Sequence, residues 1–129
     1  MRRIVLDMQG GIFAEAIKNA LGNSNFDFVI FTSAKPEETV AMCRTCHANV
    51  LVMEVARKGI WNLNERLKIL SELRSNETVR DCKTLLLVDE MADEMLAADV
   101  RQAVKDEVAD NFIYASVSPT YLAGVIDAL

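Results

Sequence analysis

Short apolar runs alternate along this chain with longer segments in which apolar residues recur at helical spacing. Five of the runs are too short for a membrane span, and each is typical of a β-strand: residues 3–7, 26–31, 49–55, 83–88 and 111–115. The run at 49–55 shows no alternation of polar and apolar residues. It is therefore predicted to be a strand buried on both faces, in the middle of a parallel sheet.

The segments after these runs are predicted to be helices, because their apolar residues repeat every three or four positions. The first helix ends at Gly22, and the second follows a cap at Thr32 or Ser33, has Pro36 in its first turn and runs to about residue 47. The last is expected to begin at Ser118-Pro119, a cap followed by proline in the first helical position. In chain order the stripes contain Phe13, Ala16, Ile17, Ala20 and Leu21; Thr39, Met42, Cys43 and Cys46; Leu63, Leu67, Leu70 and Leu73; Leu96, Val100, Ala103 and Val104; and Leu122, Val125, Ile126 and Leu129.

Strands that alternate with helices through short loops indicate right-handed βαβ units. We therefore predict an α/β fold: a doubly wound five-stranded parallel sheet in the flavodoxin-like order 2-1-3-4-5, with helices on both faces. The length of 129 residues fits a single domain, 1–129. The last apolar stripe is unfinished at Leu129, which suggests that this domain is the N-terminal part of a longer protein.

Composition narrows the function classes. The formal net charge is -5, and Lys and Arg cluster nowhere beyond Arg2-Arg3, so direct contact with nucleic acid is not expected. The sequence contains no signal-peptide core and no apolar run long enough for a transmembrane helix, so we expect a cytoplasmic protein without membrane contact. The three cysteines are then expected to be free thiols.

Acidic residues end three of the predicted strands: Asp7, Glu54 and Asp89. In the predicted strand order these ends are neighbours, and ligands in such sheets bind beyond the carboxyl ends of the strands. The three acids are therefore expected to converge in one acidic pocket. Carboxylates arranged in this way bind Mg²⁺, and one beside the metal can accept a phosphoryl group. The alternative interpretation is that these acids face solvent or cap the following helices.

A family resemblance rests on several features. They are the five strand-helix units, the first strand Arg3-Ile4-Val5-Leu6-Asp7, the strand from Asn49 to Glu54, the segment Ala109-Asp110-Asn111-Phe112-Ile113, and Ser118-Pro119. In these features the chain resembles, over nearly its whole length, the receiver domain of bacterial two-component response regulators. The resemblance implies a regulatory module of signal transduction. It makes Glu54 the equivalent of the phosphoacceptor.

The chain departs from the receiver pattern at four functional places. Receivers carry adjacent acids after the first strand, an Asp acceptor, a Thr or Ser that ends the fourth strand, and a Lys-Pro pair after the fifth. Those places read here as Asp7-Met8, Glu54, Val88 and Ala115-Ser116, and the switch-equivalent positions are Val88, Tyr114 and Ala115. Asp89 could take the role of Val88, because this alignment is good to about a residue.

Each departure removes a chemical group that phosphoryl transfer uses. The Glu54 side chain is one methylene longer than that of aspartate, which misplaces the carboxylate for in-line transfer. Met8 removes a hard metal ligand, Val88 lacks a hydroxyl, and Ala115 lacks the ammonium that would pair with a phosphoryl group. We therefore predict a degenerate receiver that is not an enzyme, whose phosphorylation is absent or atypical, and that needs no cofactor beyond weak Mg²⁺ binding.

The segment Cys43-Arg44-Thr45-Cys46-His47 fits the pattern for covalent haem attachment, but such attachment occurs in exported proteins. Cys43 and Cys46 share the apolar face of the second helix, so we interpret the thiols as small core residues. A thioredoxin-like dithiol is disfavoured because the pair lies at the C-terminal end of that helix. The question of a metal site formed by Cys43, Cys46, His47 and Cys82 stays open.

These inferences lead to two hypotheses of different class. The first is a signalling module that controls an output such as transcription through protein contacts, with a sensor kinase or an output domain as possible partners. In the family that it resembles, the fourth helix, fifth strand and fifth helix mediate dimerisation, and Tyr114 and Tyr121 lie in that region. The second is a small flavodoxin-like enzyme or cofactor-binding domain that holds a divalent cation with Asp7, Glu54 and Asp89. The response of Trp61 fluorescence to Mg²⁺ should distinguish them.

Overall fold

The computed structural model describes residues 1–33, 35–88 and 94–129. In these ranges the strands are β1 (Arg2–Asp7), β2 (Phe28–Ser33), β3 (Val50–Val55), β4 (Lys83–Val88) and β5 (Asn111–Tyr114). The α-helices are α1 (Gly11–Gly22), α2 (Thr39–Cys46), α3 (Leu63–Ser75), α4 (Glu94–Lys105) and α5 (Pro119–Ala128). Two short 3-10 helices, η1 (Pro36–Glu38) and η2 (Gly59–Trp61), precede α2 and α3.

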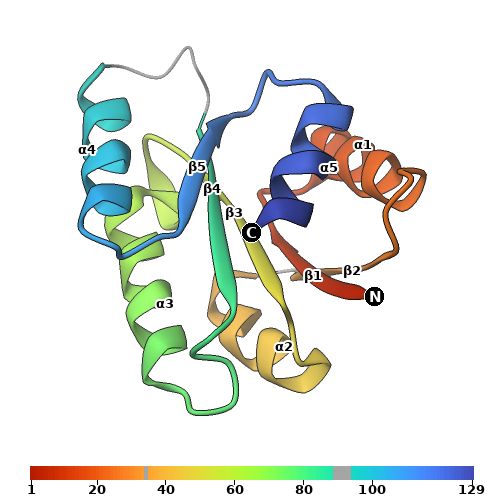
Figure 1. The fold of residues 1–129 in the computed structure, drawn as a ribbon. Helices are drawn as coiled ribbons and strands as arrows, with labels where there is room; N and C mark the ends of the chain where they lie inside the picture. The colour runs from red at the N-terminus through yellow and green to blue at the C-terminus, as the bar shows by residue number, and fades with distance from the viewer. Residues whose placement is uncertain (34, 89–93) are drawn as a thin grey trace.

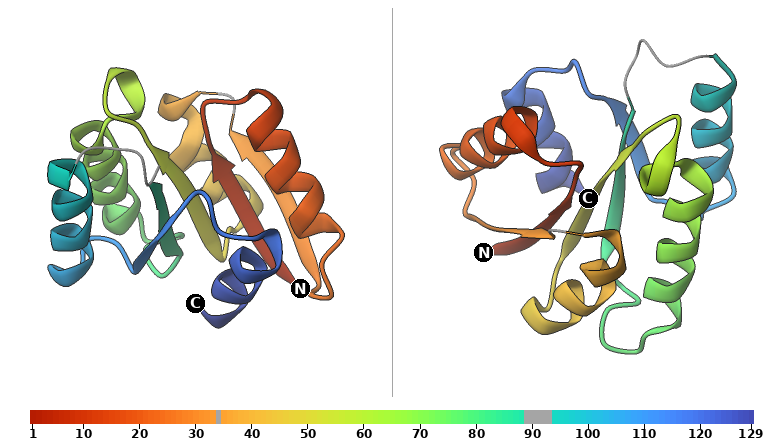
Figure 2. Two further views of the ribbon diagram at one scale, coloured as in Figure 1. Left: turned by 90° about the horizontal axis from the view of Figure 1, so that it is seen from above. Right: turned by 180° about the vertical axis from the view of Figure 1, so that it is seen from behind.

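The strands of the described ranges form one parallel sheet in the order β2-β1-β3-β4-β5 (Figure 1), which confirms the predicted topology. Helices α1 and α5 cover one face of the sheet, and α2, α3 and α4 cover the other (Figure 2). All strands point the same way, so their carboxyl ends lie along one edge. We call this the carboxyl edge and the opposite one the amino edge.

Side chains that alternate along each strand build two separate apolar cores. In β3, Leu51 and Met53 pack under α2, α3 and α4, whereas Val50 and Val52 pack under α1 and α5. We call these two layers the α2–α4 core and the α1–α5 core. As predicted for a central strand, Val50, Leu51, Val52 and Met53 are all fully buried.

The predicted start and end of the second strand are both corrected. Strand β2 begins at Phe28 and continues through Ser33, two residues later than predicted, because it pairs with β1 from Arg2 to Asp7. Thr32 and Ser33 therefore belong to the strand and cap no helix. Phe26 lies before β2, where its ring stacks on that of Phe28 at 5.4 Å.

Local signals for the helix starts agree with the structure at two places. The side chain of Asn62 caps α3 by accepting a hydrogen bond from the backbone nitrogen of Glu65. Ser118 caps α5 by accepting one from Tyr121, with Pro119 in the first turn as predicted. Among the described residues, no helix combines the length and apolar character needed to cross a membrane.

Candidate functional site

The carboxylate of Asp7, the last residue of β1, is buried at the carboxyl edge with a relative exposure of 1%. Its Oδ2 accepts two short hydrogen bonds, one from Thr39 Oγ1 at 2.6 Å and one from Arg66 Nη1 at 2.7 Å. Its Oδ1 is also buried and has no partner among the described residues. A buried carboxylate with a cationic partner forms strong, charge-assisted hydrogen bonds, so Asp7 is held in one position.

Arg66 supplies the positive charge at this edge. It lies on α3, and its side chain is fully buried. Besides the ion pair with Asp7, its Nη2 donates to the Asp7 carbonyl oxygen at 3.2 Å and its Nε donates to the Glu54 carbonyl oxygen at 2.8 Å. One guanidinium therefore joins the carboxyl ends of β1 and β3. The planar fork of arginine suits this arrangement, because its donors are fixed relative to one another.

The sequence places Arg66 in the middle of an apolar stripe. Arg66, Leu70 and Leu73 are the buried residues of α3, and they follow one another at helical spacing. Leu70 and Leu73 belong to the α2–α4 core, and Arg66 shares the buried face of α3 with them. Burial lowers the pKa of Arg66, and the neighbouring Asp7 carboxylate acts in the opposite direction.

Two hydroxyl groups extend the buried polar cluster toward β2. Thr39 begins α2 and is fully buried, and Ser33 ends β2 with 5% exposure. Their oxygen atoms are 2.9 Å apart, and Ser33 Oγ also donates to the Lys35 carbonyl oxygen at 2.9 Å. The cluster of Asp7, Ser33, Thr39 and Arg66 thus connects β1, β2, α2 and α3. We call it the carboxyl-edge cluster.

Glu54 lies beside this cluster, and its charge, like that of Asp7, acts to raise the pKa of Arg66. In the sheet, Asp7 is opposite Met53, which packs into the α2–α4 core. Glu54 is the next residue of β3, so its side chain leaves on the other face. There its Oε1 accepts a hydrogen bond from the backbone nitrogen of Gln9 at 2.9 Å.

The strand ends that carry Asp7 and Glu54 are neighbours, as predicted. In the pairing of β1 with β3, Asp7 is opposite Met53, the residue before Glu54, so the two side chains start from opposite faces of the sheet. Asp89, the third predicted acid, lies outside the described residues. The functional role of these acids stays a prediction.

The switch-equivalent positions are neighbours in the structure. Val88 is fully buried at the end of β4 and is opposite Tyr114 in β5. The backbone nitrogen of Ala115 donates to the Val88 carbonyl oxygen at 2.8 Å, although β5 itself ends at Tyr114 and not at Ala115 as predicted. The Tyr114 ring packs edge-to-face on Phe112 with centroids 6.0 Å apart. Val88 and Ala115 offer only apolar side chains here.

The structure bears on the open question of a metal site formed by Cys43, Cys46, His47 and Cys82. Within residues 1–33, 35–88 and 94–129, no three His, Cys, Asp or Glu side chains are placed to hold a metal ion together. Cys43 and Cys82 are buried, Cys46 is half-buried and His47 is exposed. His47 ends α2 in a left-handed conformation with φ of 54°.

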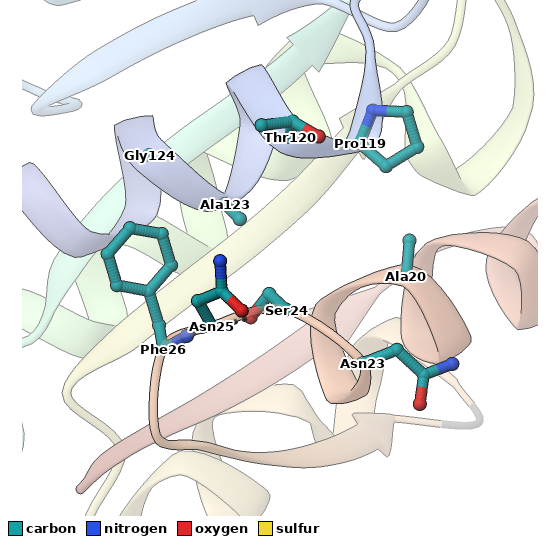
Figure 3. A pocket seen from close by; sticks show the side chains of 9 residues that line it. All are labelled: Ala20, Asn23, Ser24, Asn25, Phe26, Pro119, Thr120, Ala123 and Gly124. Carbon is teal, nitrogen blue, oxygen red and sulfur yellow. Dashed lines mark hydrogen bonds between the residues drawn. The ribbon is translucent and has the colours of Figure 1, made fainter.

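A separate cavity of about 520 Å³ lies between α5, the end of α1 and the loop that follows it (Figure 3). Small residues of the two helices, among them Ala20, Ala123 and Gly124, leave this space, and the Phe26 ring closes one end. The cavity is on the α1–α5 side of the sheet, whereas the carboxyl-edge cluster is on the other. It is therefore no part of the candidate site.

The apolar and acidic patterns treated separately do not predict the carboxyl-edge cluster, because its cation, Arg66, lies within the apolar stripe of α3. The signal was present: a single arginine occupies a core position of a helix whose other buried residues are leucines. A buried arginine requires an acidic partner, and Asp7 was already predicted at the carboxyl edge. Combining the two patterns would have predicted the Asp7–Arg66 ion pair.

Comparisons with known proteins address the fold. Neither a protein-family model nor a curated protein matches the sequence. A response regulator from Desulfuromonas acetoxidans is similar in structure with a TM-score of 0.76 and 18% identity, over 99% of this chain and 95% of that one. A chemotaxis protein of Vibrio cholerae matches with a TM-score of 0.76 and 15% identity, over 100% and 99%. An adenylate cyclase from Rhodopirellula baltica matches with a TM-score of 0.77 and 16% identity, over 98% and 85%. The chain has the fold of response-regulator receiver domains.

Proposed function

We propose that this chain is a regulatory module of signal transduction that works through contacts with other proteins and without phosphorylation of Glu54. The receiver fold supports the signalling role. The observation that carries the phosphorylation-independent part is the buried Arg66, which already pairs with Asp7 at the edge where receivers would bind a cation.

The Arg66–Asp7 pair opposes metal binding for a physical reason. A divalent cation such as Mg²⁺ needs several hard oxygen ligands around it. Asp7 Oδ2 is already bound by Arg66 and Thr39, and the Glu54 carbonyl oxygen is bound by Arg66. Displacing the guanidinium would leave a buried positive charge without a partner, which is strongly unfavourable. The site therefore holds its own permanent cation.

The surroundings of Glu54 also oppose acceptor chemistry. Its Oε1 is bound by the Gln9 backbone, and its side chain is longer than the aspartate that receivers use. The residue after Asp7 is the buried Met8, which offers no hard ligand. Val88 and Ala115 add no hydroxyl or ammonium group at the ends of β4 and β5. Misplacement of a reacting group by about 1 Å can lower a rate by about two orders of magnitude.

Treatment with acetyl phosphate or phosphoramidate in the presence of Mg²⁺ tests the proposal directly. We expect intact-mass spectrometry to show no added phosphoryl group, while a receiver domain that accepts phosphoryl groups from the same donor, treated in parallel, gains one. A phosphoryl group mapped to Glu54 would overturn the proposal.

A variant that restores the acids tests the part assigned to Arg66. In Met8→Asp/Glu54→Asp the acidic residues of a receiver are present again, but Arg66 is retained. Trp61, half-buried in η2 beyond the end of β3, provides the signal for an Mg²⁺ titration. We expect the fluorescence of this variant to stay as insensitive to Mg²⁺ as that of the unchanged chain. A saturable response in the variant would show that Arg66 does not exclude the cation.

The same titration separates the proposal from its alternative, a divalent-cation-dependent enzyme or cofactor-binding domain. That alternative needs a saturable Mg²⁺ response in the unchanged chain. The regulatory module needs none.

The proposed contact surface is formed by α4, β5 and α5, through which we propose that the chain dimerises. In support, β5 is an edge strand of the sheet, and Met95 of α4 and Tyr121 of α5 are exposed by 76% and 57%. Exposed large apolar residues favour contact with a partner. The replacements Met95→Glu and Tyr121→Glu are expected to shift light-scattering mass from dimer to monomer. The matched control is Ile12→Glu on α1, where the side chain is 91% exposed, and it should leave the mass unchanged. A monomer for the unchanged chain at high concentration would refute dimerisation.

A further inference from the structure

Two thiols, Cys43 and Cys82, lie in the α2–α4 core outside the carboxyl-edge cluster. Cys43 lies on the buried face of α2, and Cys82 immediately precedes β4. Their exposures are 0% and 3%, and both belong to the α2–α4 core. Each thiol changes the pKa of the other, so the two side chains are neighbours within this core. Residues 39 positions apart in the chain are thus brought together by the packing of α2 against the sheet.

The two thiols differ in electrostatic character. The interaction with Cys82 raises the pKa of Cys43, and burial acts in the same direction. The interaction with Cys43 lowers the pKa of Cys82, opposed by burial and by Asp110 and aided by the positive charge of Arg74. Cys82 Sγ also donates a hydrogen bond to the Lys83 carbonyl oxygen at 3.6 Å. The thiolate is the nucleophilic form of cysteine, so Cys82 is the more reactive member of the pair.

A cavity gives access to Cys82. Its volume is about 260 Å³, and Arg3, His47, Asn49 and Cys82 are among the residues that line it. This space exceeds the roughly 30 Å³ share of one water molecule several times over. Arg3, His47, Asn49 and Asp81 make much of its lining polar, so a small polar reagent can enter. Cys43 is not among the residues that line the cavity.

We propose that Cys82 and Cys43 form an oxidation site, at which a hydroperoxide that enters the cavity converts the pair into a disulfide. In the first step the sulfur of Cys82 attacks the terminal oxygen of the hydroperoxide, and the O–O bond breaks. The other oxygen leaves with a proton as an alcohol or water, and Cys82 becomes a sulfenic acid.

In the second step the sulfur of Cys43 attacks the Cys82 sulfur, the S–O bond breaks, and water leaves with the proton of the Cys43 thiol. The two thiols together lose two hydrogens and two electrons. The hydroperoxide takes up both as it is reduced. No other co-reactant is needed.

The third cysteine is a poor member of such a pair. Cys46 follows Cys43 by three positions on α2, and Cβ atoms at this spacing in a helix are about 5–6 Å apart. A disulfide requires a Cβ separation of about 3.8 Å, so a Cys43–Cys46 bond would distort the helix. Burial also raises the pKa of Cys46. Cys46 therefore provides the matched control.

The test uses the full chain, freed of bound metal with a chelator and treated with hydrogen peroxide. Remaining thiols are then alkylated in denaturant, and disulfides are mapped by peptide mass spectrometry. We expect the unchanged chain and Cys46→Ser to lose two alkylation sites and to give the same Cys43–Cys82 cross-linked peptide. In Cys43→Ser the reaction should stop at a sulfenic acid on Cys82 that dimedone traps. In Cys82→Ser, Cys43 should stay reduced.

Three outcomes would overturn the inference. Cys43 and Cys82 could both stay alkylatable at a peroxide concentration that oxidises the exposed thiol in half of the molecules of a reference peptide. The mapped disulfide could join Cys43 to Cys46. The Cys43–Cys82 disulfide could form only in urea, where the fold is lost; circular dichroism of each variant identifies that case. None of these outcomes bears on Glu54 phosphorylation, so the oxidation site and the proposed function succeed or fail separately.

Discussion

The two faces of the sheet bury different kinds of side chain. The buried polar or charged residues of the described ranges are Asp7, Ser33, Thr39, Arg66 and Thr84, and all of them lie on the face covered by α2, α3 and α4. Cys43 and Cys82 are on this face as well. The α1–α5 core contains only apolar side chains, such as Leu21, Leu85 and Ile126.

The two faces of the sheet are therefore stabilised in different ways. The α1–α5 core depends on burial of apolar area, which tolerates any side chain of suitable size. The polar groups of the other face need partners at fixed distances, and each loses much if its partner is removed. The polar face therefore determines where α2 and α3 lie relative to the ends of β1 and β3. The apolar face mainly adds stability.

The largest expected effect comes from breaking the buried ion pair. Arg66→Met should lower the free energy of unfolding by about 4 kcal/mol, because it leaves the buried Asp7 charge without a cation. Urea denaturation followed by circular dichroism measures the change. The double variant Arg66→Met/Asp7→Asn should recover much of the loss, since it removes both charges. Lys68→Met, which replaces an exposed cation on the same helix, serves as the control and should be nearly neutral. A small effect of Arg66→Met alone would contradict this account of the polar face.

A cavity on the apolar face should be next in size. Leu122→Ala removes a buried side chain of the α1–α5 core and is expected to destabilise the fold by about 3 kcal/mol. Unlike the loss caused by Arg66→Met, this loss of stability should not be recovered by a second substitution that removes a charge. Combined with Arg66→Met, its effect should be additive, because the two residues contact opposite faces. Strong non-additivity in the same urea experiment would show that the faces are not independent.

Removal of one hydroxyl should have a smaller effect. Thr39→Val deletes the donor to Asp7 Oδ2 and the contact with Ser33 while it keeps the shape of the side chain. We expect a loss of about 1–2 kcal/mol. Thr32→Val, at an exposed position of β2, is the matched control and should change the unfolding free energy little. Equal effects of the two replacements would argue against a structural role for the Thr39 hydroxyl.

The smallest effect is expected where the polar face reaches solvent. Arg74 Nη2 and Asp110 Oδ2 are 3.0 Å apart, with side-chain exposures of 33% and 29%. Asp110→Asn should cost less than about 1 kcal/mol, because exposed ion pairs contribute little and asparagine can still accept from the Thr84 backbone nitrogen. Added salt should reduce this difference further, whereas it should leave the effect of Arg66→Met almost unchanged. Thermal denaturation at low and high salt separates the two cases.

The candidate site was predictable only in part. The strand ends at Asp7 and Glu54 and the buried position of Cys43 followed from periodicity, which is a local property. The shift of β2 to Phe28–Ser33 did not, because pairing with β1 sets that boundary. Arg66, the partner of Asp7, is 59 positions away in the sequence. Cys82 is 39 positions from Cys43, so no local pattern contains both cysteines.

By itself the sequence determined the alternation of strands and helices, the parallel sheet, and the apolar stripes, since these depend on neighbours a few positions apart. Only the tertiary structure decided which face of the sheet receives each acid and which cation meets it. Side chains alternate along a strand, so a difference of one residue in the pairing of β1 with β3 moves a carboxylate to the opposite face. That pairing placed the Asp7 carboxylate against Arg66, while the Glu54 side chain starts from the opposite face of the sheet.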